Sequence, residues 1–395
     1  MADNFGYQTG TVVKALEMKD YYIWDCSVVK SDGKYHMFSS RWKKEMGFGW
    51  NWLFNSEVIH SVSDTPEGPY VFQNVVLPRR GRQYFDGMST HNTCIKEYKG
   101  KYYLYYMGTT YGGEIPQKAE EIPENYGLET WNRKRIGLAV ADDINGPFVR
   151  RDEPLLEPRD CTHWDCTITT NPSVAILPDG TTYMMYKSRA AFGKPLQLGI
   201  AVADKPDGEF RRLSDEPILQ FENSDFHVED PFFWYDEKRK KFCMIAKDDS
   251  KNGSAGITGE WGSGFYAESD DCIHFQIAPN PKVYSRKVKW ADGRETIQGN
   301  LERPSLLFDE NGNPTHLFCA SGYGSNPYDF EGNTFVVCMK LEKEKCEKYQ
   351  ELYRKYSDEI YMWQATGKEK KSEKKSMDWG MCFRDGVMLG SLRLR

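Results

Sequence analysis

The sequence predicts an all-β fold, a five-bladed β-propeller followed by a C-terminal tail. A hairpin pattern occurs five times, a second strand pair follows it in at least four copies, and turn and strand formers are abundant. The 395 residues include 14% aromatic residues, 34 glycines and 19 prolines. Radial repetition of four-stranded sheets is how a propeller protects its strand edges. A β-sandwich with chance internal similarity is the alternative.

The first half of each repeat is a polar pair, a short apolar strand, a turn and an aromatic strand. Its copies are WDCSVVKSDGKYHMFSS from Trp24, HNTCIKEYKGKYYLYYMG from His91, TNPSVAILPDGTTYMMYKS from Thr170, EDPFFWYDEKRKKFCMIAKD from Glu229 and ERPSLLFDENGNPTHLFCASG from Glu302. Four copies carry a turn that supplies the positive φ of tight hairpins: Asp32-Gly33, Lys99-Gly100, Asp179-Gly180 and Asn311-Gly312. Each copy therefore predicts a β-hairpin.

The second half adds a strand, a turn and a short outer strand. It reads EVIHSVSDTPEGPYVF from Glu57, RIGLAVADDINGPFVRR from Arg135, QLGIAVADKPDGEFRRL from Gln197 and GFYAESDDCIHFQIA from Gly264. Four strands per repeat result, which is the size of a propeller blade. After the fifth hairpin only TFVVCMKLEKE from Thr334 remains. We therefore expect another part of the chain to complete the last blade.

The repeats predict the domain boundaries. We expect the propeller to occupy residues 1–341. Residues 342–395 are expected to form a C-terminal helix, a Lys-rich linker and a terminal segment that packs on the propeller or closes it. The helix is predicted over 342–363, and the charged run GKEKKSEKK after it is typical of a solvated tether.

Charge and hydropathy exclude several classes of partner. The net charge is −6 and no basic stripe stands out, which argues against nucleic acid. The sequence has no apolar run near the roughly 18 residues that span a bilayer, so we expect no membrane partner. The start MADNFGYQTG does not resemble a secretory signal, and we expect a cytoplasmic protein, with a trimmed export signal left open as the alternative.

The ten cysteines form no repeated CxxC pairs, and we interpret most of them as reduced thiols in the core. The stretch CTHWDC, residues 161–166, combines two cysteines, a histidine and an aspartate, which is a conceivable zinc-binding set. No second pair of ligands accompanies it elsewhere. We therefore predict no metal-ligating residues.

The polar pairs are the candidate site. Inner strands surround the propeller axis, so the pairs are expected to form one ring: Trp24-Asp25, His91-Asn92, Thr170-Asn171, Glu229-Asp230 and Glu302-Arg303. Burying unpaired carboxylates is costly, so their presence indicates a function, with a structural ion-pair network as the alternative. Glycoside hydrolysis needs one protonated and one ionised carboxyl group, and crowded carboxylates beside an arginine supply both.

The ordered motifs WDC, HN, NP, EDP and ERP, joined by S/A-D-x-x-x-G-P-F turns, resemble the five-bladed glycoside hydrolases over residues 20–340. The resemblance is closest to family 117 and the wider family 43 group. It implies a blade-one aspartate as general base, which is Asp25, and inversion of configuration. A family 43 interpretation makes Glu229 the general acid. A family 117 interpretation makes Glu302 catalytic and Asp230 the residue that tunes pKa values.

This sequence has Asn171 where family 43 has an aspartate, so we favour Asp25, Asp230 and Glu302 as catalytic residues, with Glu229 as the rival acid. The predicted substrate-binding residues are Trp24, His91, Asn92, Asn171, His227 and Arg303. We expect an oligosaccharide substrate and no required cofactor. A divalent cation in the central channel, known in relatives, and a homo-oligomer stay open.

Long loops at 112–131 and 247–262 favour exo action, because they can close one end of the site. Two other functions remain as alternatives. A propeller phosphorylase would need a cationic phosphate site, to which Lys187, Arg189 and Arg303 could contribute. A noncatalytic carbohydrate-binding propeller would keep the aromatic residues without the chemistry.

Overall fold

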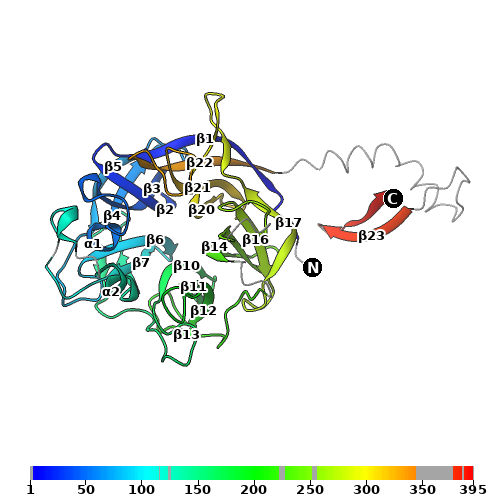
Figure 1. Cartoon of the computed structure of the whole chain (residues 1–395). Coiled ribbons are helices and arrows are strands. Elements are labelled where there is room, and N and C mark those ends of the chain that lie inside the picture. The colour runs from blue at the N-terminus through cyan, green and yellow to red at the C-terminus, as the bar shows by residue number, and fades with distance from the viewer. Residues whose placement is uncertain are drawn as a thin grey trace, which may run out of the picture. The chain divides into compact units, whose positions relative to one another are not determined.

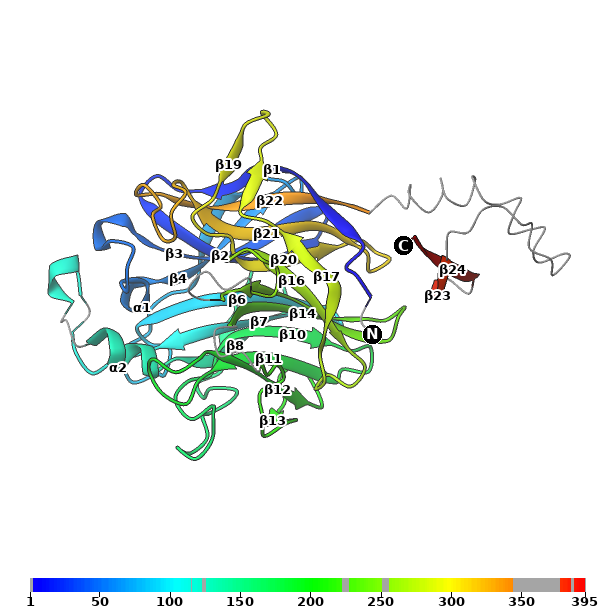
Figure 2. The same ribbon diagram turned by 45° about the vertical axis from the view of Figure 1, so that its right-hand side comes forward.

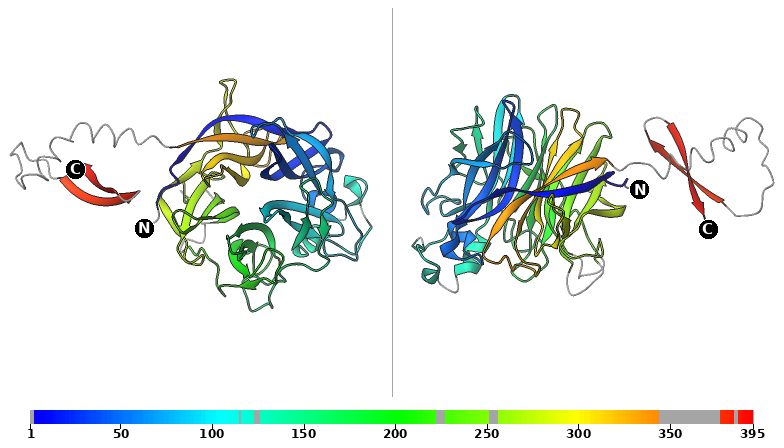
Figure 3. Two further views of the ribbon diagram at one scale, coloured as in Figure 1. Left: turned by 180° about the vertical axis from the view of Figure 1, so that it is seen from behind. Right: turned by 90° about the horizontal axis from the view of Figure 1, so that it is seen from above.

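The computed structural model describes residues 3–114, 116–122, 126–221, 227–250, 256–343, 377–384 and 387–394. The chain divides into two units, Met1–Lys343 and Glu344–Arg395. The first unit is the predicted five-bladed β-propeller: five four-stranded antiparallel sheets surround one axis (Figure 1). The same ring is seen from behind in Figure 3.

Blades 1 to 4 follow the chain order from the inner to the outer strand. Blade 1 contains β2 (Tyr21–Ser31), β3 (Lys34–Lys43), β4 (Glu57–Ser63) and β5 (Val71–Leu77). Blade 2 contains β6 (Ser89–Tyr98), β7 (Lys101–Thr109), β8 (Arg135–Ala141) and β9 (Val149–Arg150). Blade 3 contains β10 (Thr170–Ile176), β11 (Thr182–Ser188), β12 (Gln197–Ala203) and β13 (Arg211–Arg212). Blade 4 contains β14 (Val228–Asp236), β15 (Lys241–Asp248), β16 (Gly264–Ser269) and β17 (Gln276–Tyr284).

Blade 5 is completed by the N-terminal strand. Its first three strands are β20 (Glu302–Phe308), β21 (Pro314–Gly322) and β22 (Thr334–Lys343), and β1 (Tyr7–Glu17) pairs antiparallel with β22 on the outside. Figure 2 shows these two strands side by side. The ring is therefore closed by hydrogen bonds between the start and the end of the propeller unit.

The C-terminal unit is described only as a hairpin of β23 (Met377–Arg384) and β24 (Val387–Leu394). The predicted helix, 342–363, and the linker after it lie outside the described residues from residue 344 onward, whereas residues 342 and 343 belong to β22.

Short elements lie between the strands. They are η1 (Lys44–Met46), α1 (Trp52–Asn55), η2 (Ala119–Glu121), α2 (Tyr126–Asn132) and the hairpin of β18 (Lys287–Lys289) with β19 (Glu295–Ile297). Among the described residues, no helix has the length and apolar character needed to cross a membrane.

The hydrophobic core lies between neighbouring blades. Strands of adjacent blades bury apolar side chains against each other, as Phe38 of β3 does with Ile95 and Leu104 of blade 2. This packing holds the five inner strands around the axis, because a sheet that is apolar on both faces is stable only when both faces are covered.

Every inner strand contains the same backbone irregularity near its start. The second residue of each polar pair has left-handed backbone geometry, with φ between 47° and 55°: Asp25, Asn92, Asn171, Asp230 and Arg303. A shift in strand register spans each of these positions. Such β-bulges redirect a side chain out of the ladder, and left-handed geometry costs a non-glycine residue about 1 kcal/mol or more. The same unfavourable backbone geometry occurs at five equivalent positions. This indicates that the side chains at these positions have a role that offsets the cost.

A buried carboxylate, Asp165, lies in the segment before β10 and contacts side chains of β11 and β13. Asp165 accepts hydrogen bonds from Arg159 Nε at 2.6 Å, Arg212 Nε at 2.5 Å and Tyr186 Oη at 2.8 Å. Asp86 has the equivalent partners in blade 2, with Arg80 Nε at 2.7 Å and Tyr106 Oη at 2.7 Å. These contacts are charge-assisted and tie the segment before each inner strand to later strands of the same blade.

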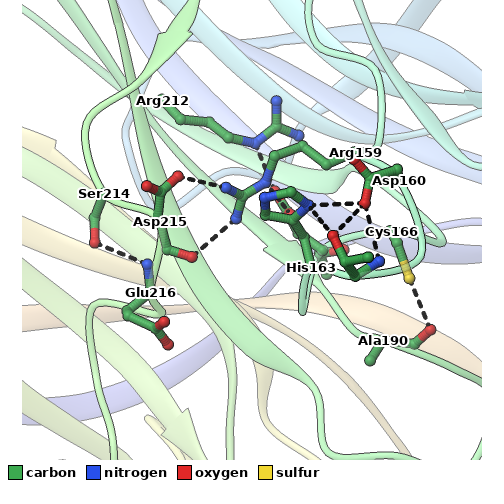
Figure 4. A network of polar contacts seen from close by, with 12 residues as sticks. Arg159, Asp160, His163, Cys166, Ala190, Arg212, Ser214, Asp215 and Glu216 are labelled. Carbon is green, nitrogen blue, oxygen red and sulfur yellow. Dashed lines mark hydrogen bonds and ion pairs between the residues drawn. The ribbon is translucent and has the colours of Figure 1, made fainter.

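The stretch CTHWDC is thus occupied by contacts within the protein. Asp165 is paired as described, His163 Nδ1 lies 3.1 Å from Asp160 Oδ1, and Cys166 Sγ donates to Ala190 O at 3.0 Å (Figure 4). Over the described ranges, no three His, Cys, Asp or Glu side chains gather into a set that could hold a metal ion.

Blade 1 buries two histidines that make folding sensitive to acid. His36 Nδ1 lies 2.9 Å from His60 Nε2 and the two rings stack. Burial, and then the neighbouring His36, lower the pKa of His60 to about 4 from 6.5. The unfolded chain therefore binds a proton that the folded chain does not, so the stability is complete above pH 6.5 and is lost as the pH falls toward 4.

We expect His60→Gln to reduce this loss, since the titrating group is removed while a hydrogen-bonding group remains for His36. The wild type should lose about 2 kcal/mol between pH 7.5 and 5 through this one site. Urea unfolding at the two pH values measures the difference. His274→Asn is the control, because His274 is exposed. If the free energy of unfolding fell equally with pH in the wild type and in His60→Gln, the expectation would be contradicted.

Candidate functional site

The polar pairs converge at one end of the axis. We call this end the upper face, the end at which β2, β6, β10, β14 and β20 begin. Three of the ring side chains form a hydrogen-bonded chain there: Asn92 Nδ2 donates to Asn171 Oδ1 at 2.7 Å, and Asn171 Nδ2 donates to Asp230 Oδ1 at 2.6 Å. Arg303 Nη1 lies 3.5 Å from the same oxygen. Residues from blades 2, 3, 4 and 5 therefore meet on the axis.

Asp25 is the blade 1 member of the ring and is completely buried. Its carboxylate accepts hydrogen bonds from Ser40 N at 2.8 Å, Ser40 Oγ at 3.0 Å and Thr93 N at 3.0 Å. Burial raises its pKa to about 6, against the opposing effects of Arg303 and these hydrogen bonds. A carboxylate can accept about four hydrogen bonds, so these three leave one acceptor position of Asp25 unfilled.

Asp230 is surrounded by positive charge. Lys187 Nζ lies 3.8 Å from its Oδ1, and Arg303 approaches the same atom. Burial raises its pKa, but the positive charges of Lys187, Arg303 and Lys247 outweigh this and bring the pKa down to about 2. Asp230 is therefore ionised at neutral pH.

Asn171 can occupy blade 3 because Asp230 carries the charge. The amide of Asn171 donates to Asp230 at 2.6 Å, which an aspartate at this position could not do. Two carboxylates at that distance would repel each other. Asn171, which departs from the family 43 pattern, is thus neutral next to the charged Asp230 of blade 4.

Glu229 precedes Asp230 and is the more accessible carboxylate, with 15% of its side chain exposed. Lys187 Nζ lies 3.1 Å from its Oε1 and Lys247 Nζ lies 3.9 Å from its Oε2. Burial, together with repulsion by Asp249 and Asp230, raises its pKa in spite of the two lysines. Its environment therefore favours the protonated form more than that of an ordinary glutamate.

Glu302 is held firmly by two donors. Lys247 Nζ donates to its Oε1 at 2.6 Å, and Asn300 Nδ2 donates to the same atom at 2.7 Å. Lys247 is completely buried and also lies 3.2 Å from Asp249 Oδ1. Charge-assisted hydrogen bonds of this kind hold the carboxylate of Glu302 in one position.

His91 is a neutral, packed imidazole. Its Nδ1 lies 2.8 Å from Ser56 Oγ, and its ring stacks on Trp52 with centroids 4.8 Å apart. Burial, and then the charge of Arg303, lower its pKa well below the usual value. It can thus serve as a hydrogen-bonding group but not as a positive charge.

Two predicted substrate-binding residues are placed by packing or backbone contacts. Trp24 is 6% exposed and makes edge contacts with Phe48 and Phe330. His227 is buried just before β14, and its carbonyl accepts a hydrogen bond from Asp249 N at 2.9 Å. The contacts described above bring the other predicted residues together in one cluster.

Loops that join the second and third strands of the blades also lie at the upper face, since the second strand ends where the inner strand begins. Each loop carries aromatic residues: Trp50 and Trp52, Trp131, Phe192, Trp261, and Tyr328. Trp261 Nε1 donates to Asp249 Oδ1 at 3.0 Å. Aromatic rings therefore surround the charged cluster.

The sequence analysis did not select several polar residues of the cluster, namely Ser40, Lys134, Lys247, Asp249 and Asn300. Some of them could be found from the residue that pairs with each polar pair across the first hairpin of its blade. Trp24 pairs with Ser40, Thr170 with Lys187 and Glu229 with Lys247 across the first hairpin of their blades. The last polar residue of an aromatic strand therefore marks a neighbour of the polar pair.

The residues on the axis do not fit a divalent cation. Arg303 already places a positive charge 3.5 Å from Asp230 Oδ1. The axial cavity below the ring is lined by Arg303 and by apolar, hydroxyl and thiol side chains, among them Pro172, Pro231 and Ser305. Hard cations prefer several carboxylate or carbonyl oxygens. No step of the proposed chemistry uses a metal here.

No protein-family model matches the sequence, and no curated protein matches it. Solved structures do match. One is Zg3597, a family 117 glycoside hydrolase produced by the marine bacterium Zobellia galactanivorans, with a TM-score of 0.59 at 17% identity over 86% of this chain and 92% of that chain. A thermostable family 43 glycoside hydrolase has a TM-score of 0.52 at 14% identity over 95% and 94%. This chain shares their five-bladed propeller.

A third match is BT0996, in a structure described as an RGII complex. It has a TM-score of 0.62 at 14% identity, and the match covers 86% of this protein and 93% of BT0996. The predicted resemblance to families 117 and 43 is thus confirmed for the fold. At these identities the chemistry has to be argued from the side chains of this protein.

Proposed function

We propose that this chain is an exo-acting glycoside hydrolase that removes a terminal sugar from an oligosaccharide with inversion of configuration. One observation carries the proposal: five left-handed positions around the axis bring Asp25, Asp230 and the neighbouring Glu229 into one buried, charged cluster. Buried charges with divergent pKa values are typical of acid–base sites.

Asp25 is the proposed general base. A base has to be ionised and close to the attacking water, and a pKa of about 6 meets the first condition at neutral pH. The hydrogen bonds from Ser40 and Thr93 fix its carboxylate and leave one of its acceptor positions unfilled. Water would donate to that position.

Glu229 is the proposed general acid in preference to Glu302. Its raised pKa and its exposed edge suit a group that gives a proton to a leaving oxygen. Glu302 instead holds Lys247 and Asn300 at 2.6 and 2.7 Å, which suits a positioning role. Asp230 stays ionised and tunes its neighbours, as the family 117 interpretation proposed.

Inversion is supported by the order of the blades. The base belongs to blade 1 and the acid to blade 4, and these blades are separated by blade 5, because β20 contacts both β2 and β14. Inverting enzymes need more space between their two carboxyl groups than retaining enzymes, to admit a water molecule. Exo action is supported by the aromatic loops that surround the cluster.

Replacing Ser40 by alanine is expected to move the acid limb of the kcat/KM profile to higher pH. The Ser40 hydroxyl stabilises the ionised form of Asp25, so its loss raises the pKa of Asp25 further. One such hydrogen bond corresponds to a shift of about 0.5 to 1 pH unit. Ser39→Ala is the matched control, since Ser39 Oγ is buried without a hydrogen bond. If the two variants gave the same dependence of kcat/KM on pH, Asp25 would not be the base.

The function itself is tested by incubating the protein with aryl glycosides and oligosaccharides, with and without inorganic phosphate. Release of free sugar independent of phosphate supports the hydrolase. Turnover that requires phosphate would indicate a phosphorylase, although Lys187 and Arg303 are already engaged by Glu229 and Asp230. Sugar binding without any turnover would indicate a noncatalytic propeller.

A further inference from the structure

Two basic side chains at the upper face, Lys134 and Arg189, form no salt bridge with the described residues. Arg189, just after β11, is 6% exposed, and its Nε and Nη2 atoms are buried without a hydrogen-bond partner. Its Cζ atom lies 3.5 Å from the centroid of Trp131. Lys134 is 3% exposed, and its Nζ lies 3.1 Å from the same centroid. Two cations thus contact one indole ring.

This arrangement is costly for the protein alone. Burying a charge without a partner is unfavourable by several kcal/mol, and a ring face compensates only part of that. Burial, followed by repulsion from Lys187 and Arg189, lowers the pKa of Lys134 well below its usual value. Lys187 differs, because Glu229 is 3.1 Å away. The two basic groups beside Trp131 are therefore not balanced by an ion pair within the described structure.

We propose that Lys134 and Arg189 bind the carboxylate of an acidic sugar, so that the substrate is a glycoside of a uronic acid. This inference rests on the hydrolase function proposed above and adds the substrate class. An arginine with two free donors matches a planar carboxylate, and a lysine adds a point charge. A neutral sugar would leave both cations unpaired in the complex.

The two cations lie where they would contact an anionic group of the bound sugar. They do not lie where an attacking phosphate would approach. Lys134 and Arg189 lie close enough to Glu229 to interact with it electrostatically, and Glu229 is the proposed acid. The attacking group has to approach Asp25, whose strongest charged neighbour is Arg303. The anion site is thus on the side of the acid.

Aromatic residues beside the two cations fit the rest of a sugar ring. Phe192 lies 6.1 Å from Trp50 and 6.3 Å from Trp131, centroid to centroid, and both Phe192 and Trp50 are exposed. Arg189 also lies over Phe192, at 4.5 Å. Apolar ring faces next to a fixed guanidinium provide both stacking and charge recognition.

The test uses oligosaccharides that end in galacturonate or glucuronate, and the same oligosaccharides after reduction of the carboxyl group to an alcohol. We expect the wild type to favour the acidic form by roughly 100-fold in kcat/KM, the range of one charge-assisted interaction. Arg189→Met should remove most of this preference, mainly through KM. Arg294→Met, in an exposed pair with Asp292, is the control and should keep it.

Arg189→Met also provides a stability readout, since methionine keeps an apolar side chain at this position and removes the unpaired guanidinium that lies over Trp131. Its melting temperature should equal or exceed that of the wild type. A marked decrease would assign Arg189 a structural role and overturn the inference. Equal cleavage of acidic and reduced substrates by the wild type would also overturn it, while leaving the hydrolase intact.

If neither form is cleaved, the proposed function fails and the anion site is decided by binding alone. Calorimetric titration with galacturonate and glucuronate should then show binding to the wild type and loss in Arg189→Met. Absence of that difference would overturn the inference. Phosphate-dependent turnover that Arg189→Met abolishes would assign the site to phosphate and would equally contradict it.

Discussion

Asp25→Asn is expected to lower kcat by roughly 1,000-fold or more, while the protein still folds and binds its substrate. The variant keeps the size of the side chain but cannot accept a proton from water, and general base catalysis contributes about 10² to 10⁴-fold. Asp32→Asn is the matched control, because Asp32 also has positive φ, 49°, but lies at an exposed hairpin turn. Turnover of one substrate under saturating conditions measures both.

Asparagine places an amide donor near Ser40 N or Thr93 N, which could cost stability. Asp25→Gly therefore serves as a second variant, since glycine readily adopts the φ of 47° found here. Added azide should restore part of its turnover and give a glycosyl azide. Wild-type rates in a folded Asp25→Asn variant would rule out Asp25 as the base.

Glu229→Gln is expected to lower the rate by about 10² to 10⁴-fold on substrates with poor leaving groups. The rate on dinitrophenyl glycosides should fall much less, because such leaving groups need no proton. Rates on a series of aryl glycosides, plotted against the pKa of the phenol, measure this. Glu237→Gln, at the exposed turn of the same blade, is the control.

Glu302→Gln distinguishes the two candidate acids. It removes a partner of the buried Lys247, so we expect a lower melting temperature and a moderate loss of rate. The dependence on the leaving group should stay as in the wild type. If Glu302→Gln showed the steep dependence and Glu229→Gln did not, the roles assigned to these residues would be reversed.

The fold was predictable because the propeller repeats its local signals. Apolar alternation and turns such as Asp32-Gly33 recur in the hairpins, and the polar pairs mark the inner strands. The closing strand was not identified in advance. Residues 7–17 contain a short alternating pattern that becomes a strand only through pairing with β22, a contact across more than 300 residues.

The positions of the candidate site were predictable from the sequence. The hydrogen bonds and ion pairs between its side chains were not. Alignment of the repeats located Asp25, Asp230 and Arg303, because each occupies the same place in its blade. It could not show that Lys247 would hold Glu302, since that contact joins two blades. The preference for Glu302 over Glu229 as the acid therefore depended on family resemblance, and the ion pairs favour the other choice.

The positions of the Lys134 and Arg189 side chains were also not predictable from the sequence. Both lie in loops between the second and third strands, where sequence periodicity gives no direction to a side chain. The sequence indicates Arg189 only as a contributor to a phosphate site and indicates no role for Lys134. Their convergence on Trp131 depends on how blades 2 and 3 pack together.

The most direct test of the central claim is proton NMR of the anomeric signals during digestion of the acidic oligosaccharides by the wild-type protein. Five converging strand starts with a base in blade 1 and an acid in blade 4 predict free terminal sugar, first released as the inverted anomer, without added phosphate. Persistently unchanged spectra from folded protein, or a sugar 1-phosphate as the product, would contradict the account.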